Sequence, residues 1–186
     1  MRIVAGRHRG RALAAPSGRD TRPTADRVRE ALFNVLLHGL AVEIEGAAVL
    51  DLFAGSGALG LEALSRGAAH AVFIDNVRAA LEVIGDNIAT LGERERADVL
   101  RRDAARLGAP PAGMVPSAIA FLDPPYGENL APAALAAALE GGWLEPGAIC
   151  VVETRRGEAF TPPPQFECRD ERVYGGTKIS FLAAPE

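Results

Sequence analysis

The chain has 186 residues, 48% of them hydrophobic, and a formal net charge of −4 at pH 7. This length and composition predict one domain with a sizeable core, and the acidic balance argues against a generally basic nucleic-acid binder. The longest uncharged apolar stretch, residues 130–139, is too short to span a membrane, and the N-terminus is charged. We therefore expect a cytoplasmic protein. Cys150 and Cys168 form no CxxC pair, and we expect buried structural thiols and no metal site.

The first 30 residues are strongly basic, with eight arginines against three acidic residues. Residues 1–6 and 11–13 flank a turn of Gly, Arg and His, which predicts a small hairpin. Any single arginine here could be a solvated surface residue, but eight together favour contact with nucleic-acid phosphates. We assign this contact to Arg2, Arg7, Arg9, Arg11 and Arg22.

Helical and strand patterns alternate through the rest of the chain. A first helix is predicted from Thr24, which suits the N-cap, to Gly39. Strands are then predicted at residues 47–52, 70–75, 97–101, 117–122 and 147–153. Helices are predicted between them at residues 57–66, 77–91 and 130–140, with a helical turn near 103–107. This alternation is typical of an α/β fold with a doubly wound, mostly parallel twisted sheet.

The C-terminal part departs from this alternation. Three prolines at 162–164 exclude a helix. Residues 165–173 and 177–182 then read as two strands joined by a glycine turn, which predicts an antiparallel hairpin at one edge of the sheet. No long linker interrupts the pattern, so we expect a single domain over residues 1–186.

Residues 50–60 leave the first strand, contain a Gly-x-Gly-x-x-Gly loop and enter a helix. Alone, this loop is a weak signal for a nucleotide cofactor. A dinucleotide pyrophosphate would lie on the helix N-terminus, but Asp51 stands four residues before Gly55, where its carboxylate would repel phosphate. The same charge attracts the α-ammonium of a methionine moiety. Asp51 therefore favours S-adenosylmethionine over a nicotinamide dinucleotide.

Acidic residues end four consecutive predicted strands, at Asp51, Asp75, Asp103 and Asp123. Asp75 is placed to accept from the ribose hydroxyls of a nucleotide, and Asp103 from an adenine amino group. Each of them alone could instead be a helix N-cap. Because parallel strands place their carboxyl ends at one edge, however, we expect the four carboxylates to line one rim.

Asp123-Pro124-Pro125-Tyr126 follows a short apolar strand. The two prolines cannot continue a ladder, so the chain must leave the sheet in a stiff turn. The Asp123 carboxylate and the Pro124 carbonyl are acceptors that can hold both N–H groups of a ring-attached amine, and Tyr126 can stack on the ring. This constellation indicates amino methylation of a nucleobase, with residues 123–126 as the catalytic motif.

On these motifs the chain resembles class I S-adenosylmethionine-dependent methyltransferases, and more closely the RsmD family of bacterial small-subunit ribosomal RNA guanine-N2 methyltransferases. The resemblance runs over nearly the whole chain and includes residues 1–6, 22–34, 51–67 and 121–126. It implies a Rossmann-like fold with a basic N-terminal arm (residues 1–22) on a catalytic core (23–186). It also implies methyl transfer from S-adenosylmethionine to N2 of a specific guanine in 16S ribosomal RNA.

The resemblance further implies a cofactor site at the glycine loop, with Arg22 and Thr24 near it and Asp75 on the ribose. The residues assigned to the cofactor are Thr24, Asp51, Phe53, Gly55, Gly57, Asp75, Asn76, Asp103 and Ala104. Two positions depart from the family pattern. Asp75 stands where Glu is frequent, and Thr154 follows Glu153 where an aromatic residue or His is common, so no role is assigned to Glu153.

Alternative functions stay open at this stage. The Asp-Pro-Pro-Tyr motif alone also occurs in enzymes that methylate adenine N6 in DNA. A non-catalytic RNA-binding assembly factor is a second alternative, and a dehydrogenase a third. We expect a monomer that acts on ribosomal RNA within a small-subunit particle; the nucleotide itself is not specified by the sequence.

Overall fold

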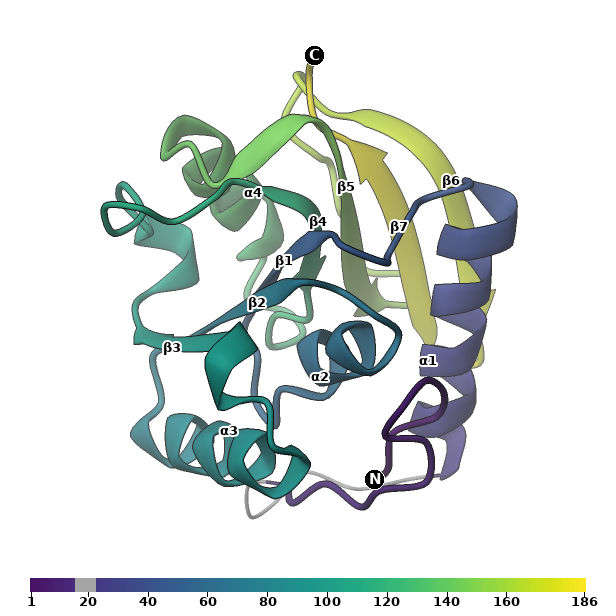
Figure 1. Cartoon of the computed structure of the whole chain (residues 1–186). Helices are drawn as coiled ribbons and strands as arrows, with labels where there is room; N and C mark the ends of the chain where they lie inside the picture. The colour runs from purple at the N-terminus through teal and green to yellow at the C-terminus, as the bar shows by residue number, and fades with distance from the viewer. Residues whose placement is uncertain (16–22) are drawn as a thin grey trace.

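The computed structural model of the protein describes residues 1–15 and 23–186. Its centre is a seven-stranded sheet with the order β3-β2-β1-β4-β5-β7-β6 (Figure 1). The strands are β1 (Ala48–Leu52), β2 (His70–Asp75), β3 (Ala97–Arg101), β4 (Ser117–Leu122), β5 (Leu144–Arg155), β6 (Glu167–Tyr174) and β7 (Thr177–Ala183). Strands β1 to β5 pair in parallel, whereas β7 runs antiparallel to β5 and β6. The predicted parallel sheet with an antiparallel C-terminal edge is confirmed.

Helices cover both faces of this sheet. They are α1 (Pro23–Asn34), α2 (Ala58–Ser65), α3 (Arg78–Leu91) and α4 (Ala131–Glu140), with a π-helical turn at Val35–Gly39 and 3-10 turns at Arg94–Arg96 and Ala104–Arg106. The first three helices and the N-terminal segment pack on one face, and α4 packs on the other (Figure 1). Within the described residues, no helix has the length and apolar character to cross a membrane.

The two faces hold separate parts of the core. Alternate strand residues point to opposite sides, so Phe73 and Phe121 pack beneath α1 and α2, while Ile74 and Leu122 pack beneath α4. The central strands β1, β2 and β4 are therefore apolar over most of their length, as expected of parallel strands covered on both faces. This alternation also determines which side chains at the strand ends point to the same face of the sheet.

Some predicted details differ from the structure. Helix α1 begins at Pro23, one residue before the predicted cap at Thr24, whose side chain lies outside the described part of the chain. The predicted N-terminal hairpin is short: the Arg2–Ala12 bridge is flanked by hydrogen bonds from the Ile3 N–H to the Arg11 carbonyl at 2.9 Å and from the Leu13 N–H to the Met1 carbonyl at 3.0 Å. Strand β5 begins earlier than predicted, at Leu144, which pairs with Ser117 across an irregularity in the ladder.

The prediction of two buried thiols is confirmed for Cys150 and wrong for Cys168. Cys150 lies in β5 with no solvent exposure, and burial raises its pKa to about 12. Cys168 is exposed, because β6 is the outer strand of the sheet and most of its residues face solvent.

The N-terminal segment is attached to the core by a buried carboxylate. Glu62, on α2, has no solvent exposure. Its two oxygens accept the backbone N–H groups of Val4 at 2.8 Å and Ala5 at 2.9 Å, and the Arg66 guanidinium at 2.8 Å. Arg29 of α1 lies 3.5 Å from the same carboxylate. Glu62 thus joins the N-terminal segment, α1 and α2.

We expect the Glu62→Ala variant to lose about 3–5 kcal/mol of unfolding free energy, because it leaves buried N–H groups and guanidinium charge without their acceptor. Urea denaturation measures this loss. Glu82→Ala is the matched control: Glu82 pairs with Arg78 on the surface of α3, with the two side chains 62% and 82% exposed. It should lose less than about 0.5 kcal/mol. Equal losses for the two variants would contradict the anchoring role of Glu62.

Candidate active site

The register of the parallel strands aligns acidic residues at the carboxyl edge of the sheet. Residue 52 of β1 is level with residue 74 of β2 and residue 122 of β4, and the latter is level with residue 152 of β5. The residues that follow these strand positions therefore also share one level. Three of them are acidic, and we call these three the acidic rim: Asp75, Asp123 and Glu153.

The other two aspartates of the predicted set lie near this rim at different depths. Asp51 pairs with Phe73 and Phe121 inside the sheet, one layer beneath the rim, and is only 2% exposed. Asp103 lies two residues beyond β3, where its side chain accepts from the Ala105 N–H at 2.9 Å. The N-cap alternative is thus the observed contact of Asp103, and all four aspartates lie toward the same end of the sheet.

The glycine loop connects β1 to α2 in an unusual backbone conformation. Phe53, Gly55 and Gly57 have φ angles of 58°, 59° and 75°. For Phe53 this left-handed conformation costs on the order of 1 kcal/mol or more, a strain that is frequent at ligand sites. Asp75 stabilises the loop, since one of its oxygens accepts the Gly55 N–H at 2.9 Å and the other accepts the Val77 N–H at 2.9 Å. A carboxylate has about four acceptor positions, so Asp75 can also receive hydroxyl donors.

Asp51 holds the start of α2 against the sheet. Its Oδ2 accepts the Gly60 N–H at 2.9 Å, so the negative charge lies at the positive end of the helix. A β-carbon at Gly60 would lie 2.4 Å from Cε1 of Phe73, which is fully buried. Only glycine therefore allows α2 to approach β2 this closely. Direct contact between Asp51 and a ligand ammonium stays a prediction, and burial leaves little of the carboxylate accessible for it.

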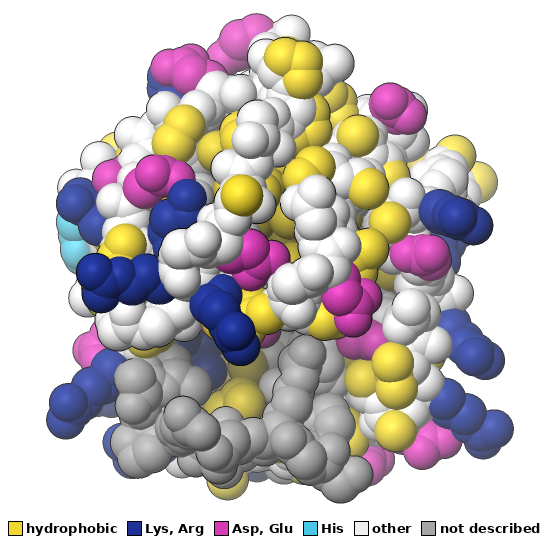
Figure 2. All heavy atoms as spheres, turned by 180° about the vertical axis from the view of Figure 1, so that it is seen from behind, with side chains coloured by type: hydrophobic (Ala, Val, Ile, Leu, Met, Phe, Trp, Pro, Cys, Tyr) yellow, Lys and Arg dark blue, Asp and Glu magenta, His cyan; other side chains and the backbone are white. Residues whose placement is uncertain are grey.

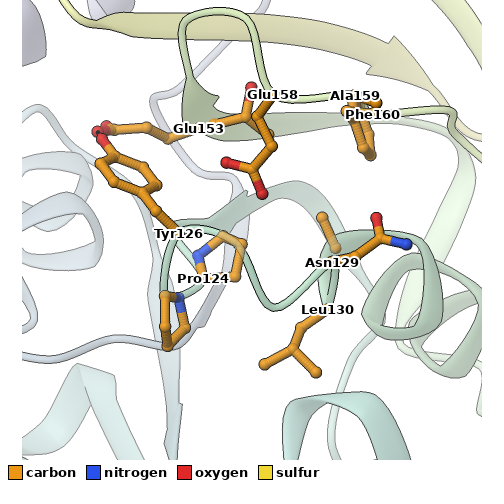
Figure 3. A pocket seen from close by; sticks show the side chains of 11 residues that line it. Pro124, Tyr126, Asn129, Leu130, Glu153, Glu158, Ala159 and Phe160 are labelled. Carbon is orange, nitrogen blue, oxygen red and sulfur yellow. Dashed lines mark hydrogen bonds between the residues drawn. The ribbon is translucent and has the colours of Figure 1, made fainter.

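The Asp-Pro-Pro-Tyr turn rests on β5 and β7. The Tyr126 hydroxyl donates to Oε1 of Glu153 at 2.7 Å and lies 3.4 Å from Oγ1 of Thr177 (Figure 3). The Arg155 guanidinium lies 5.6 Å from the centroid of the Tyr126 ring. Burial, together with the carboxylates of Glu153 and Asp123, raises the pKa of Tyr126, so the phenol stays protonated as a donor.

A second carboxylate supports the same turn from behind. Glu158 accepts the Gly127 N–H at 3.0 Å and the Arg155 N–H at 3.2 Å, and Figure 3 shows it pointing toward the turn. A hollow of about 10 Å³ lies between this turn and the segment that ends at Phe160. That space is too small for a nucleobase.

A larger hollow of about 500 Å³ lies at the opposite end of the sheet. It is lined by the first residues of several strands and by the loop before β4, including Val49, His70, Asp98, Met114 and Ser117. Ligands of open α/β sheets bind at the carboxyl ends of the strands. The chemistry of the acidic rim, rather than the size of this hollow, therefore identifies the candidate site.

The predicted RNA-binding arginines fall into different groups. Arg7 pairs with buried Glu93, and Arg11 donates to the Thr90 carbonyl at 2.8 Å. Arg2 is 69% exposed and lies 3.5 Å from Asp26. Arg9 is exposed; its backbone N–H donates to the Gly6 carbonyl at 3.2 Å, and its side chain makes no hydrogen bond or ion pair among the described residues, whereas Arg22 lies outside them. Figure 2 shows acidic and basic side chains interspersed on one face, with a basic side chain next to the acidic ones near its centre.

The remaining predicted cofactor residues also lie near the carboxyl edge. Asn76 is exposed directly after β2, and Ala104 is buried at the start of a 3-10 turn. One residue was missed: Asn87 of α3, which donates to the carbonyls of Ser56 at 2.9 Å and Ala14 at 3.0 Å. The signal was present, because Asn87 is the single amide within the apolar, buried face of α3.

Glu153 is the second residue whose contact was not foreseen. Its position in the register, next to Asp123, follows from the predicted strands, but its bond to Tyr126 depends on the path of the Pro-Pro turn. Among the described residues no cluster of three His, Cys, Asp or Glu side chains could hold a metal ion.

The comparisons with known proteins agree with this arrangement. A family model described as conserved hypothetical protein 95 matches residues 1–183. The chain is 40% identical over 176 residues to "Ribosomal RNA small subunit methyltransferase D" of Escherichia coli K12, covering 94% of this chain and 85% of the relative. The protein of the same name from Haemophilus influenzae is 36% identical over 176 residues, covering 94% and 89%.

A solved structure has the same fold over the full length. It is the "Putative methyltransferase yhhF" of Escherichia coli, with a TM-score of 0.81 and 38% identity, and the match covers 100% of this chain and 98% of that chain.

The close contact between Gly60 and Phe73 gives a stability test. Gly60→Ala should lose about 1–3 kcal/mol of unfolding free energy, because the added methyl group displaces a buried ring and disturbs the bond from Gly60 to Asp51. Gly85→Ala on α3 is the control, since a β-carbon there meets no atom within 4 Å. It should gain about 0.5–1 kcal/mol from helix propensity. Urea midpoints that move equally for both variants would contradict the close packing of α2 on β2.

Proposed function

The chain belongs to the family described as conserved hypothetical protein 95, the RsmD family, and we propose that it methylates the exocyclic N2 of a guanine in small-subunit ribosomal RNA. The observation that carries this proposal is the position of the Asp-Pro-Pro-Tyr turn, level with the glycine loop on adjacent strands. An acceptor turn for an amine and a nucleotide-type loop thus share one edge of the sheet. The substrate is ribosomal RNA within a small-subunit particle, and the protein acts as a monomer.

The residues of the glycine loop fit S-adenosylmethionine, which supplies an electrophilic methyl group and leaves as the neutral thioether. Asp75 would accept from the ribose hydroxyls, with Asn76 beside it. The backbone of Phe53, Gly55 and Gly57 and the start of α2 would receive the amino-acid part, because helix N-termini favour carboxylates. Asp103 and Ala104 would lie at the adenine ring.

The turn at residues 123–126 prepares the amine. The lone pair of a guanine amino group is delocalised into the ring, so the nitrogen is a weak nucleophile. Asp123 and the Pro124 carbonyl accept its two N–H groups and orient the lone pair out of the ring plane. Such alignment can lower the barrier by about 7–11 kcal/mol. Asp123 then takes the proton that the nitrogen loses as the new N–C bond forms.

Tyr126 binds the base itself. It is 41% exposed, and its hydroxyl is held by Glu153, which fixes the plane of the ring. Stacking of a base on an aromatic side chain contributes about 1–3 kcal/mol. This contact offsets part of the cost of a few kcal/mol for taking the base out of its stack.

Methyl transfer to isolated substrates tests the proposal. Purified protein with labelled S-adenosylmethionine is offered small-subunit particles, free small-subunit ribosomal RNA and duplex DNA, and the products are digested to nucleosides. Mass spectrometry should find one N2-methylguanosine per RNA. N6-methyladenosine in DNA would instead support the adenine alternative, and the absence of any transfer would support a non-catalytic RNA-binding factor.

We expect the Asp123→Asn variant to lose about 100-fold or more in single-turnover rate, because the amide is a poorer acceptor and cannot take the proton. Its affinity for S-adenosylmethionine, measured by calorimetry, should stay near that of the parent. The control is Asp98→Asn at the opposite end of the sheet, where Asp98 is 50% exposed and pairs with His70. A normal rate for Asp123→Asn would remove Asp123 from the mechanism.

We expect the N-terminal segment to contact RNA phosphates through its exposed arginines. Arg9→Ala should reduce the slope of log affinity against log salt concentration by about 1, the value for one lost phosphate contact. Arg169→Ala is the control, because it removes the same charge from the outer strand β6. Filter binding over a salt series measures both slopes. An equal change in the two variants would assign the effect to net charge alone.

A further inference from the structure

The neighbour of the amine-binding carboxylate is a second carboxylate. Residue 122 of β4 is level with residue 152 of β5, so Asp123 and Glu153 follow side by side on adjacent strands. Adjacent strands lie about 4.8 Å apart. Glu153 belongs to β5 and pairs with Ile179 of β7, so its backbone is fixed on both sides by ladders. The position of its carboxylate is therefore set by the sheet and not by a loop.

Tyr126 joins the two carboxylates into one site. Its hydroxyl donates to Glu153 at 2.7 Å, and its turn begins at Asp123, which lies level with Glu153 on the adjacent strand. The ring that stacks on the base is thus attached to Glu153 (Figure 3). A carboxylate can accept about four hydrogen bonds, so Glu153 can hold Tyr126 and receive a further donor. A base stacked on Tyr126 would therefore present its edge to two acceptors.

Purine edges differ in what they offer to such a pair. Guanine has two neighbouring donor positions, the amino group at C2 and the hydrogen on N1. Adenine has an amino group at C6, but its neighbouring N1 carries a lone pair. Two adjacent carboxylates can accept from both donors of guanine, whereas adenine would place its N1 lone pair against a negative charge. Two adjacent carboxylates would therefore favour guanine, a preference that the Asp-Pro-Pro-Tyr motif alone does not specify.

We propose that Glu153 is the specificity residue of this site and accepts the N1–H of the guanine while Asp123 holds its amino group. This inference rests on the proposed function and adds the residue that selects the base. Glu153 takes no part in the methyl transfer; it selects guanine over bases that have an acceptor at N1. A buried site built to receive a donor rejects an analogue without it because the acceptor then loses its partner.

The analogue 2-aminopurine tests this selection. It keeps the amino group at C2 but has a lone pair at N1. Small-subunit ribosomal RNA is assembled by ligation with guanine or 2-aminopurine at the methylated position, and single-turnover transfer is measured with saturating S-adenosylmethionine. We expect the parent protein to methylate guanine on the order of 100-fold faster.

The Glu153→Gln variant should reverse much of this preference. Its amide oxygen can still accept the Tyr126 hydroxyl, while its NH2 group can donate to the N1 lone pair of 2-aminopurine. We expect 2-aminopurine to be methylated faster by this variant than by the parent, and the guanine preference to fall below about 10-fold. Since 2-aminopurine lacks O6 in every reaction, the comparison between proteins isolates the effect at N1.

The Tyr126→Phe variant separates the selection of the base by Glu153 from the positioning of the Tyr126 ring. It removes the hydroxyl that Glu153 holds but leaves the carboxylate, so both substrates should slow while the guanine preference is kept. Glu153→Ala should slow both substrates and lose the preference. A parent protein that methylates both bases equally, or a Glu153→Ala variant that keeps the parent's preference, would overturn the inference. A parent protein that methylates neither base would overturn the proposed function itself.

Discussion

The parallel register of β2, β1, β4 and β5 is the constraint on which the site depends. Because residues 74, 52, 122 and 152 of these strands are level with one another, residues far apart in sequence are brought to the same edge of the sheet. Asp75 and Glu153 are 78 positions apart, yet they lie on the same rim. A shift of one residue in any of these ladders would turn the acidic side chain to the other face. The hydrophobic alternation that fills the two core layers therefore also positions the chemistry.

Buried polar side chains connect this rim to the segments around it. Glu62 anchors the N-terminal segment, Asp51 anchors α2, and Asn87 ties the glycine loop to the chain at Ala14. Each is at most 2% exposed, and each accepts or donates to backbone groups that would otherwise be buried without partners. Such groups are costly to leave unsatisfied, so they define one arrangement of loop, arm and helix. The glycine loop and the basic segment are consequently parts of the same rigid framework.

The sequence was sufficient for the fold and for the main motif, but not for every contact. Apolar runs and helical spacing located all five parallel strands, and their parallel pairing followed from the alternation with helices. The hairpin was expected at one edge of the sheet, but the exposure of Cys168 was not predicted, because the pairing of β7 with β5 decides which strand of the hairpin lies outermost. The hydrogen bond between Tyr126 and Glu153 was also not predicted, because it joins two segments through a turn whose path depends on tertiary packing. Local patterns specify elements, whereas contacts between distant segments require the register.

The distribution of charge explains how an acidic protein can act on a polyanion. Three carboxylates at the rim repel phosphate but attract N–H donors, so the rim favours base edges over backbone. The exposed arginines of the N-terminal segment have the opposite preference, and the Glu62 and Glu93 contacts fix this segment against α2 and the end of α3. In the proposed function, RNA phosphates therefore favour the N-terminal segment over the rim. A base can reach the rim only after it leaves its stack, so the proposed site would favour an unstacked base.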